Sequence, residues 1–248
     1  MLSFLKSHPF AVEAFFDQSL VLTYAVPVAE LAPLLPPCLA ADAWQQQWGF
    51  VAVALVQTRH LRPQGWPTWL GRDFYLIGYR LFVRYTTAAG RRLRGLYILR
   101  SETDQKLMEL AGNLFTHYCY HTVDIAHQQH GAEISIRSHR AAFQAEVHRP
   151  AGLARLPAGS PFSSWQQARR FAGPLPFTFS YDAPTRRVLL IEGMREHWQP
   201  QPVEVTTAHV GFLKQLPFSQ VQLASAFVVE NIPYHWQKGR TEQWQPHP

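Results

Sequence analysis

The sequence is poor in cysteine and lacks the short motifs of many enzyme sites. Only two cysteines, Cys38 and Cys119, occur among 248 residues. That number is too small for a disulfide framework. A single bridge between the two stays open, but a reduced compartment is the simpler interpretation. There is no GxG, HExxH, CxxC or GxSxG, and no Gly-Lys pair ahead of Ser or Thr. These absences exclude the usual dinucleotide, zinc, serine-hydrolase and Walker signatures, but not a site assembled from distant parts of the chain.

Charge is also scarce. Charged residues make up 16% of the chain and apolar residues 47%, which excludes disorder and supplies a sizeable core. The net charge is +6, and a basic protein can meet nucleic acid. The tightest basic clusters, Arg91-Arg92 with Arg94 and Arg186-Arg187, directly follow turn residues. Exposed turn arginines are usually solvated, so we predict no nucleic-acid partner.

Long hydrophobic runs are missing. No window approaches the roughly 18 uncharged apolar residues that span a bilayer, so we predict no membrane partner. Near the N-terminus, Glu13 and Asp17 interrupt the apolar stretch that a signal peptide needs. We therefore expect a cytoplasmic protein. Without repeats or long linkers, we expect a single domain over residues 1–248, and a homo-oligomer stays open.

Strand-like runs dominate the chain, and turn residues separate most of them. Thr87–Gly90 and Gln128–Gly131 each lie between two runs and predict hairpin loops. The predicted strands are Leu20–Val26, Gly49–Thr58, Phe74–Thr86, Leu93–Arg100, His117–Ala126, Ala132–His139, Phe177–Tyr181, Arg187–Met194 and Leu223–Glu230.

Helices are few. Ser101 and Asp104 have the spacing of a capping pair and predict a helix that begins near them. Two shorter helices are expected at Ser163–Ala172 and Val28–Leu35. The first helix carries an apolar stripe at helical spacing: Leu107, Leu110, Ala111, Leu114 and Phe115.

The order of these elements indicates a fold class. The βαβ alternation of parallel sheets is absent, and many strands surround a few inserted helices. We therefore predict an α+β fold, mostly antiparallel β, with a few flanking helices.

The run Phe74–Arg84 carries the first candidate site. Alternation along a strand puts Arg80 and Arg84 on one otherwise apolar face. Two arginines there must meet partners or water. The functional interpretation is an anion pocket inside a barrel, because a guanidinium suits a carboxylate. The alternative is a structural ion pair, for which Glu192 is the candidate partner.

A second pattern could bind a metal. As a strand, His117, Cys119 and His121 share one face, and imidazole and thiolate are good zinc ligands. The spacing matches no standard motif, and twelve histidines make chance clustering easy. We predict no metal and no cofactor.

Lysine is rare. Only Lys6, Lys106, Lys214 and Lys238 occur, against nineteen arginines. A Schiff-base mechanism would need one of these four, desolvated enough to lower its pKa. Lys106 follows a predicted strand and lies near Glu102, although an exposed helix lysine is the simpler interpretation.

Several segments form a pattern that spans nearly the whole chain, and none is a catalytic signature. They are Val26–Pro36, Gly49–Val53, Gly78–Arg84, Gly95–Leu99 with its following helix, Trp198–Pro200 and Pro202-Val203. In this order they resemble a bacterial family of unknown function, the domain of unknown function 2071 family, in the acetoacetate decarboxylase-like superfamily.

The resemblance implies a conical, largely antiparallel β-barrel with flanking helices and an interior cavity. In the decarboxylase of that superfamily, a cavity lysine forms a Schiff base with a β-keto acid, and arginine and glutamate line the pocket. This chain has Lys106 in the corresponding region, without the paired lysine or the Gly-Phe-Pro turn. Leu76 stands where relatives often carry a glutamate. Of the features that the resemblance implies, Arg80 and the interior cavity are the ones that this sequence matches best.

Two hypotheses place function in this cavity. In the first, the protein binds a small anionic organic molecule through Arg80 and Arg84, with Glu102, Glu192 and Lys106 as polar neighbours. In the second, it is a lyase or decarboxylase-like enzyme that acts on a keto acid through Lys106 as the imine-forming amine.

A third hypothesis places function on the surface. Trp66, Trp69 and Trp244 lie in proline-rich segments that read as loops. If they are exposed, they favour a non-catalytic domain that binds a protein partner. Whether the chain is an enzyme stays open at this point.

Overall fold

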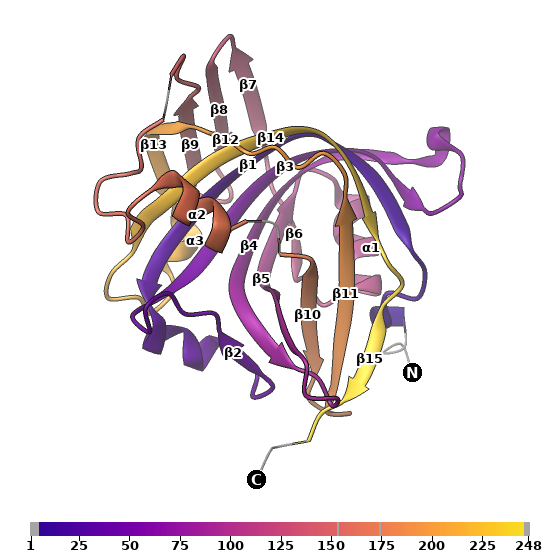
Figure 1. Ribbon diagram of the computed structural model, residues 1–248. Coiled ribbons are helices and arrows are strands. Elements are labelled where there is room, and N and C mark those ends of the chain that lie inside the picture. Colours follow the sequence, from indigo (N-terminus) through magenta and orange to yellow (C-terminus); the bar gives the residue numbers. More distant parts are fainter. Residues whose placement is uncertain (1–4, 153, 174, 246–248) are drawn as a thin grey trace.

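A closed β-sheet forms the body of the protein (Figure 1). The computed structural model describes residues 5–152, 154–173 and 175–245. Eleven strands make this sheet, and the pairing of β11 with β14 joins its two ends into a ring. The ring strands, in order, are β14 (Gln222–Trp236), β1 (Val12–Pro27), β3 (Trp48–Pro63), β4 (Arg72–Thr86), β5 (Arg92–Thr103), β10 (Phe177–Asp182) and β11 (Arg187–Arg195).

Shorter strands extend the ring. They are β2 (Leu39–Ala41) on β4, β6 (Tyr120–Thr122) on β5, β12 (Gln201–Pro202) on β14 and β15 (Arg240–Gln243) on β11. Only β5 with β10 and β5 with β6 pair in parallel among the described strands. The predicted α+β fold with a mostly antiparallel sheet is confirmed.

A second, four-stranded antiparallel sheet packs against the ring (Figure 1). Alternation along the ring strands divides their side chains between two environments. Val53 on β3 and Leu81 on β4 belong to the main core, together with Ile136 and Val147 of the second sheet. Their neighbours in sequence turn to the opposite face and line a cavity. The second sheet consists of β13 (Glu204–Val210), β9 (Phe143–His148), β8 (Glu133–Ser138) and β7 (Ala126–His130).

The helices are short. No helix in the described part of the chain is long and apolar enough to cross a membrane. Helix α2 begins after Ser164, whose hydroxyl accepts a hydrogen bond from the backbone N–H of Gln167 at 3.2 Å, one residue later than the predicted cap. The α-helices are α1 (Lys106–Phe115), α2 (Trp165–Phe171) and α3 (Gly211–Lys214), and 3-10 turns cover Leu5–Ser7, Val28–Leu34 and Thr68–Leu70.

The predicted capping pair of α1 is wrong. Ser101 belongs to β5, and the Asp104 carboxylate accepts a hydrogen bond from the backbone N–H of Tyr75 at 2.9 Å instead. The helix therefore begins only at Lys106, and its N-cap makes no side-chain hydrogen bond. Pairing with β4 explains the difference, since it carries β5 three residues further than expected.

The apolar stripe of α1 is only partly covered. Leu107, Ala111 and Phe115 line the cavity, although Leu107 is also 54% exposed, whereas Leu110 is 70% exposed. A helix of this length has room for one buried face, and that face belongs to the cavity side. Leu110 and Leu114 lie on the outer side of the helix and are exposed to solvent.

One predicted strand is wrong, and several strands were not predicted. Most of His117–Ala126 is irregular, because Cys119 adopts a left-handed backbone with φ of 49° that breaks the alternation. The strands absent from the predicted set are β2, β9, β12, β13 and β15. The predicted hairpin at Thr87–Gly90 joins β4 to β5, whereas the β7–β8 turn lies at Gly131, after β7 has run on to His130.

Candidate functional site

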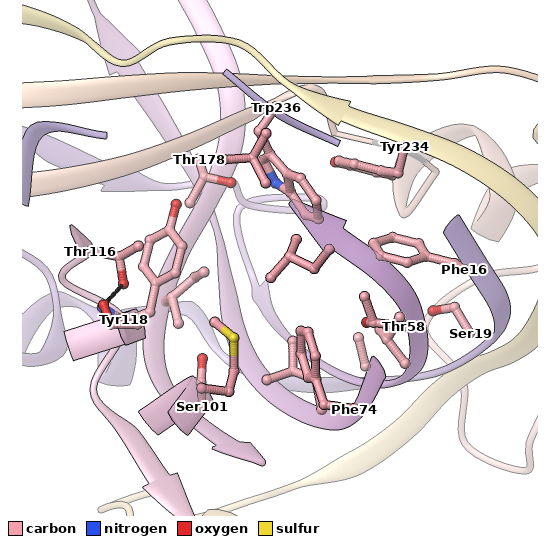
Figure 2. A pocket seen from close by; sticks show the side chains of 18 of the residues that line it. Phe16, Ser19, Thr58, Phe74, Ser101, Thr116, Tyr118, Thr178, Tyr234 and Trp236 are labelled. Carbon is pink, nitrogen blue, oxygen red and sulfur yellow. Dashed lines mark hydrogen bonds between the residues drawn. The ribbon is translucent and has the colours of Figure 1, made fainter. Parts of the chain in front are cut away.

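The ring encloses a cavity of about 750 Å³. All seven ring strands contribute lining side chains, and α1, β6 and the segment before β1 add further walls. Most of these side chains are aliphatic or aromatic, with isolated hydroxyl groups among them (Figure 2). A cavity of this size lies within the range of about 300–1,000 Å³ that holds medium-sized organic ligands.

Arg80 projects into the cavity from β4. Protein encloses its side chain, and its Nε has no hydrogen-bond partner. Burial lowers the pKa of Arg80, and the nearby tyrosines, with Tyr234 foremost, oppose that shift. A guanidinium nevertheless stays protonated in proteins. Arg80 therefore brings an uncompensated positive charge into a largely apolar space.

A second arginine, Arg195, shares this space. It is the last residue of β11, and its guanidinium stacks on Trp198 at 4.9 Å and on Tyr234 at 5.7 Å. Burial lowers the pKa of Arg195, the neighbouring Tyr234 opposes this, and the charge of Arg80 lowers it further. The two guanidinium groups are thus close enough to repel one another.

No carboxylate of the described residues pairs with either arginine. Among the described lining residues, only Asp73 carries one, and it lies at the exposed mouth, where Phe10 and Leu107 also line the cavity. Asp73 is held by Arg59 at 2.9 Å and by the backbone N–H of His60 at 2.8 Å. The interior is therefore electropositive.

Neutral hydrogen-bonding groups lie near the arginines. Figure 2 shows the hydroxyls of Ser101, Thr178 and Tyr118 on the cavity wall. The Tyr118 hydroxyl is buried without a well-formed hydrogen bond, although Thr178 lies toward it. Burial raises the pKa of Tyr118, so this phenol stays protonated and can donate to an anion.

Two glycines leave room for the side chains of Arg80 and Tyr234. A Cβ at position 78 would lie 3.0 Å from Nε of Arg80, so Gly78 lets the guanidinium fold back over the strand. A Cβ at position 193 would overlap the hydroxyl of Tyr234. Both glycines lie inside strands, where glycine weakens a sheet unless a close approach requires it.

The structure separates Arg84 from Arg80. Arg84 lies nearer the end of β4, and its Nε donates to Asp42 at 2.5 Å. Arg94 holds the other carboxylate oxygen of Asp42 at 2.6 Å, and the side chain of Asp42 is fully buried. Arg84 therefore forms an ion pair, with Asp42 rather than Glu192 as its partner, and does not line the cavity.

Glu102 lies on the opposite face of β5 from the cavity residue Ser101. Its buried carboxylate accepts a hydrogen bond from the Tyr79 hydroxyl at 2.8 Å and pairs with Arg100 at 3.0 Å. Burial raises the pKa of Glu102, and Tyr79 and Arg100 partly oppose this. Glu102 is thus part of the core that joins the two sheets.

Glu102→Gln should stabilise the fold at neutral pH. Because the folded pKa of Glu102 is raised, the native state holds a proton that the unfolded chain releases above about pH 4.3. The wild-type unfolding free energy should therefore fall as pH rises through the folded pKa, while the amide variant lacks this fall. Urea unfolding between pH 4 and 8 measures the difference. If the stability advantage of the variant over the wild type instead grew toward acid pH, the raised pKa would be contradicted.

Lys106 and Glu192 do not line the cavity. Lys106 is exposed at the start of α1, and in that turn Gln105 and Leu107 supply the lining side chains. Glu192 is exposed on β11, with its backbone carbonyl accepting from the N–H of Gln237 at 2.8 Å. Of the five predicted site residues, the structure places Arg80 alone in the cavity wall.

The remaining sequence candidates lie outside the cavity. Trp66 is 55% and Trp69 80% exposed, whereas Trp244 packs edge-on against Tyr181. Cys119 is an exposed free thiol. No group of three metal-ligating side chains that could hold an ion is present in the described part of the chain.

Arg195 was missed by sequence reasoning, although a signal existed. Residues of one strand face alternate, so Arg195 shares its face with Leu189, Ile191 and Gly193. Leu189 and Ile191 pack with Tyr118 and Tyr120 at the cavity wall. The predicted strand ended at Met194. Extending it by one residue would have placed Arg195 on the same face as Ile191 and Gly193.

Comparison with protein families identifies the chain. Residues 14–231 match DUF2071, a family described as an uncharacterized conserved protein. The chain belongs to this family. A search of curated proteins finds no match.

Solved structures confirm the predicted acetoacetate decarboxylase-like fold. The chain resembles acetoacetate decarboxylase from Legionella pneumophila, with a TM-score of 0.62, 9% identity, and coverage of 94% of this chain and 88% of that one. It also resembles an acetoacetate decarboxylase-like enzyme from Sphingomonas wittichii RW1, with a TM-score of 0.58, 13% identity, and coverage of 95% and 93%. A third is the enduracididine biosynthesis enzyme MppR complexed with pyruvate, with a TM-score of 0.57, 12% identity, and coverage of 94% and 90%.

Proposed function

We propose that this protein binds an organic anion in the ring cavity, with Arg80 as the main anion contact and Arg195 as the second. The observation that carries this proposal is the pair of enclosed guanidinium groups without a carboxylate partner among the described residues. Burying a charge is costly unless it is paired. A ligand carboxylate would supply the missing pair, and the fork of a guanidinium suits its geometry.

The chemistry of a relative supports the choice of a carboxylate. MppR, which shares the fold, is described in complex with pyruvate, a small carboxylate. The neutral phenol of Tyr118 and the hydroxyls of Ser101 and Thr178 suit the same group as hydrogen-bond donors. Localisation in the cytoplasm remains part of this proposal.

The imine mechanism receives no support from the cavity. All four lysines lie in the described part of the chain, and none lines the cavity. A Schiff base with a bound keto acid needs an amine within reach of the carbonyl carbon. We therefore propose binding of the anion rather than imine-based decarboxylation.

Isothermal titration with matched ligands tests the proposal. Octanoate should bind and 1-octanol should bind at least tenfold more weakly, because charge-assisted hydrogen bonds contribute about 1.5–3 kcal/mol. Arg80→Met should remove that preference for the anion. The control is Arg92→Met, at an exposed position in the turn that begins β5, and it should bind like the wild type. If Arg80→Met keeps the full preference for octanoate, the anion site lies elsewhere.

A further inference from the structure

We infer that the ligand is an amphiphile, with one carboxylate at Arg80 and an apolar chain that runs along the cavity to its mouth. This inference rests on the proposed function and adds the chemical class of the ligand. Three features of the cavity support it: the position of the charge, the nature of the walls beyond it, and the surface around the mouth.

Strand register places the charge far from the mouth. The Arg80 guanidinium folds back over Gly78, which aligns with Ala54 on β3. Toward the mouth, Phe74 aligns with Thr58. Four residues of strand separate Gly78 from Phe74, which is about 13 Å at ~3.3 Å per residue. A carboxylate at Arg80 therefore lies well inside the ring.

The walls between the charge and the mouth are apolar. Phe16, Val56 and Leu76 line this stretch in strand register, and Met108 and Phe115 of α1 add further apolar lining. Ser19 and Thr58 add small hydroxyls, and the charged lining residues Arg62, Arg72 and Asp73 lie beyond Phe74 in strand register. A short keto acid would leave these side chains facing water, whereas an alkyl or aryl chain would cover them.

Apolar surface continues outward around the mouth. Phe10 and Leu107 line the cavity and are also 39% and 54% exposed. Most of the exposed large apolar side chains in the described residues belong to the three segments that border the mouth: Phe10, Trp66, Trp69, Leu70, Leu107, Leu110 and Leu114. Arg62, Arg72 and Asp73 also line the cavity on this side, so a chain that extends beyond the ring would find apolar surface beside charged side chains.

Titration with straight-chain carboxylates tests the ligand class. Butanoate, hexanoate, octanoate and decanoate share one head group and differ only in chain length. Each buried methylene contributes about 0.8 kcal/mol, so Kd should fall about fourfold per carbon. Arg80→Met should weaken all four by a similar factor, because it removes only the contact with the head group.

A variant of the wall separates the chain from the head group. Ala111 lines the cavity from α1, so Ala111→Trp should fill the space for the chain. It should abolish the gain from hexanoate to decanoate and leave butanoate unchanged. Lys106→Trp is the matched control, because Lys106 is exposed on the same helix and does not line the cavity.

The outcomes distinguish the two proposals. If butanoate and pyruvate bind through Arg80 and longer chains bind no tighter, the amphiphile is wrong and the anion site stands. If affinity rises with chain length but 1-octanol equals octanoate and Arg80→Met has no effect, both proposals fail. A chain-length gain that is lost in Ala111→Trp, with a head-group loss in Arg80→Met, supports both.

Discussion

Arg80→Met should make the unliganded protein more stable while it removes anion binding. The enclosed guanidinium has no carboxylate partner among the described residues, so the empty protein carries the cost of desolvating it. Methionine has a similar length and suits the apolar wall. We expect the unfolding free energy to rise by about 2 kcal/mol, since replacing buried charges by apolar side chains often stabilises by ~1–4 kcal/mol.

Urea unfolding without ligand measures this effect. The exposed control Arg92→Met should change stability by less than about 0.5 kcal/mol. Stability gained together with binding lost marks a residue kept for function. If Arg80→Met instead destabilises by several kcal/mol, Arg80 is a structural residue that its tyrosine neighbours hold, and the carboxylate needs another contact.

Removing both arginines around Asp42 should cost far more than the two single changes together. Asp42 is fully buried and shared by Arg84 and Arg94, so either single variant leaves it one cation. Each single change to methionine should cost about 1 kcal/mol, because both arginine side chains are partly exposed. The double variant strands a buried carboxylate and should lose about 3–5 kcal/mol.

A third substitution isolates the cause. Adding Asp42→Asn to the Arg84→Met/Arg94→Met double variant removes the buried charge and should restore most of the loss. Neighbouring residues that share a partner are expected to be non-additive in this way. Strict additivity of the two single variants in thermal unfolding would show that Asp42 does not depend on them.

The predictable part of the site is the part that one strand determines. Alternation along Phe74–Arg84 is enough to put Arg80 and Arg84 on one face of β4. The same rule does not say where along the strand the cavity ends. Arg84 lies beyond that end because β2 pairs with β4 there, and Asp42, which directly follows β2, brings its carboxylate within reach.

Residues near strand ends were harder to place. Glu102 was expected as a polar neighbour of the anion site, near Lys106, and the strand before it was expected to end at Arg100. The strand continues to Thr103, with a bulge opposite Tyr79 and Arg80, and this continuation fixes the face on which Glu102 lies. The later end of β5 also changes the place of Lys106. The helix begins at Lys106, and Gln105 and Leu107 line the cavity instead of this lysine.

Strand β9 shows what sequence reasoning could still recover. Phe143, Ala145 and Val147 are buried, and the residues between them are partly exposed. That alternation of apolar and polar residues is present in the sequence, although no strand was predicted there. Its partner β13 has no such pattern, and its place depends on pairing with β9 across some 60 residues of chain.

A short pairing between β11 and β14 closes the ring, and it lies at the candidate site. Only three residue pairs join β11 to β14, and one of them is Arg195 with Tyr234. A bound molecule that contacts both Arg195 and Tyr234 would bridge β11 and β14 and stabilise their pairing. Its affinity would then include the free energy of keeping the ring shut, so occupancy and the integrity of the fold become a single linked equilibrium.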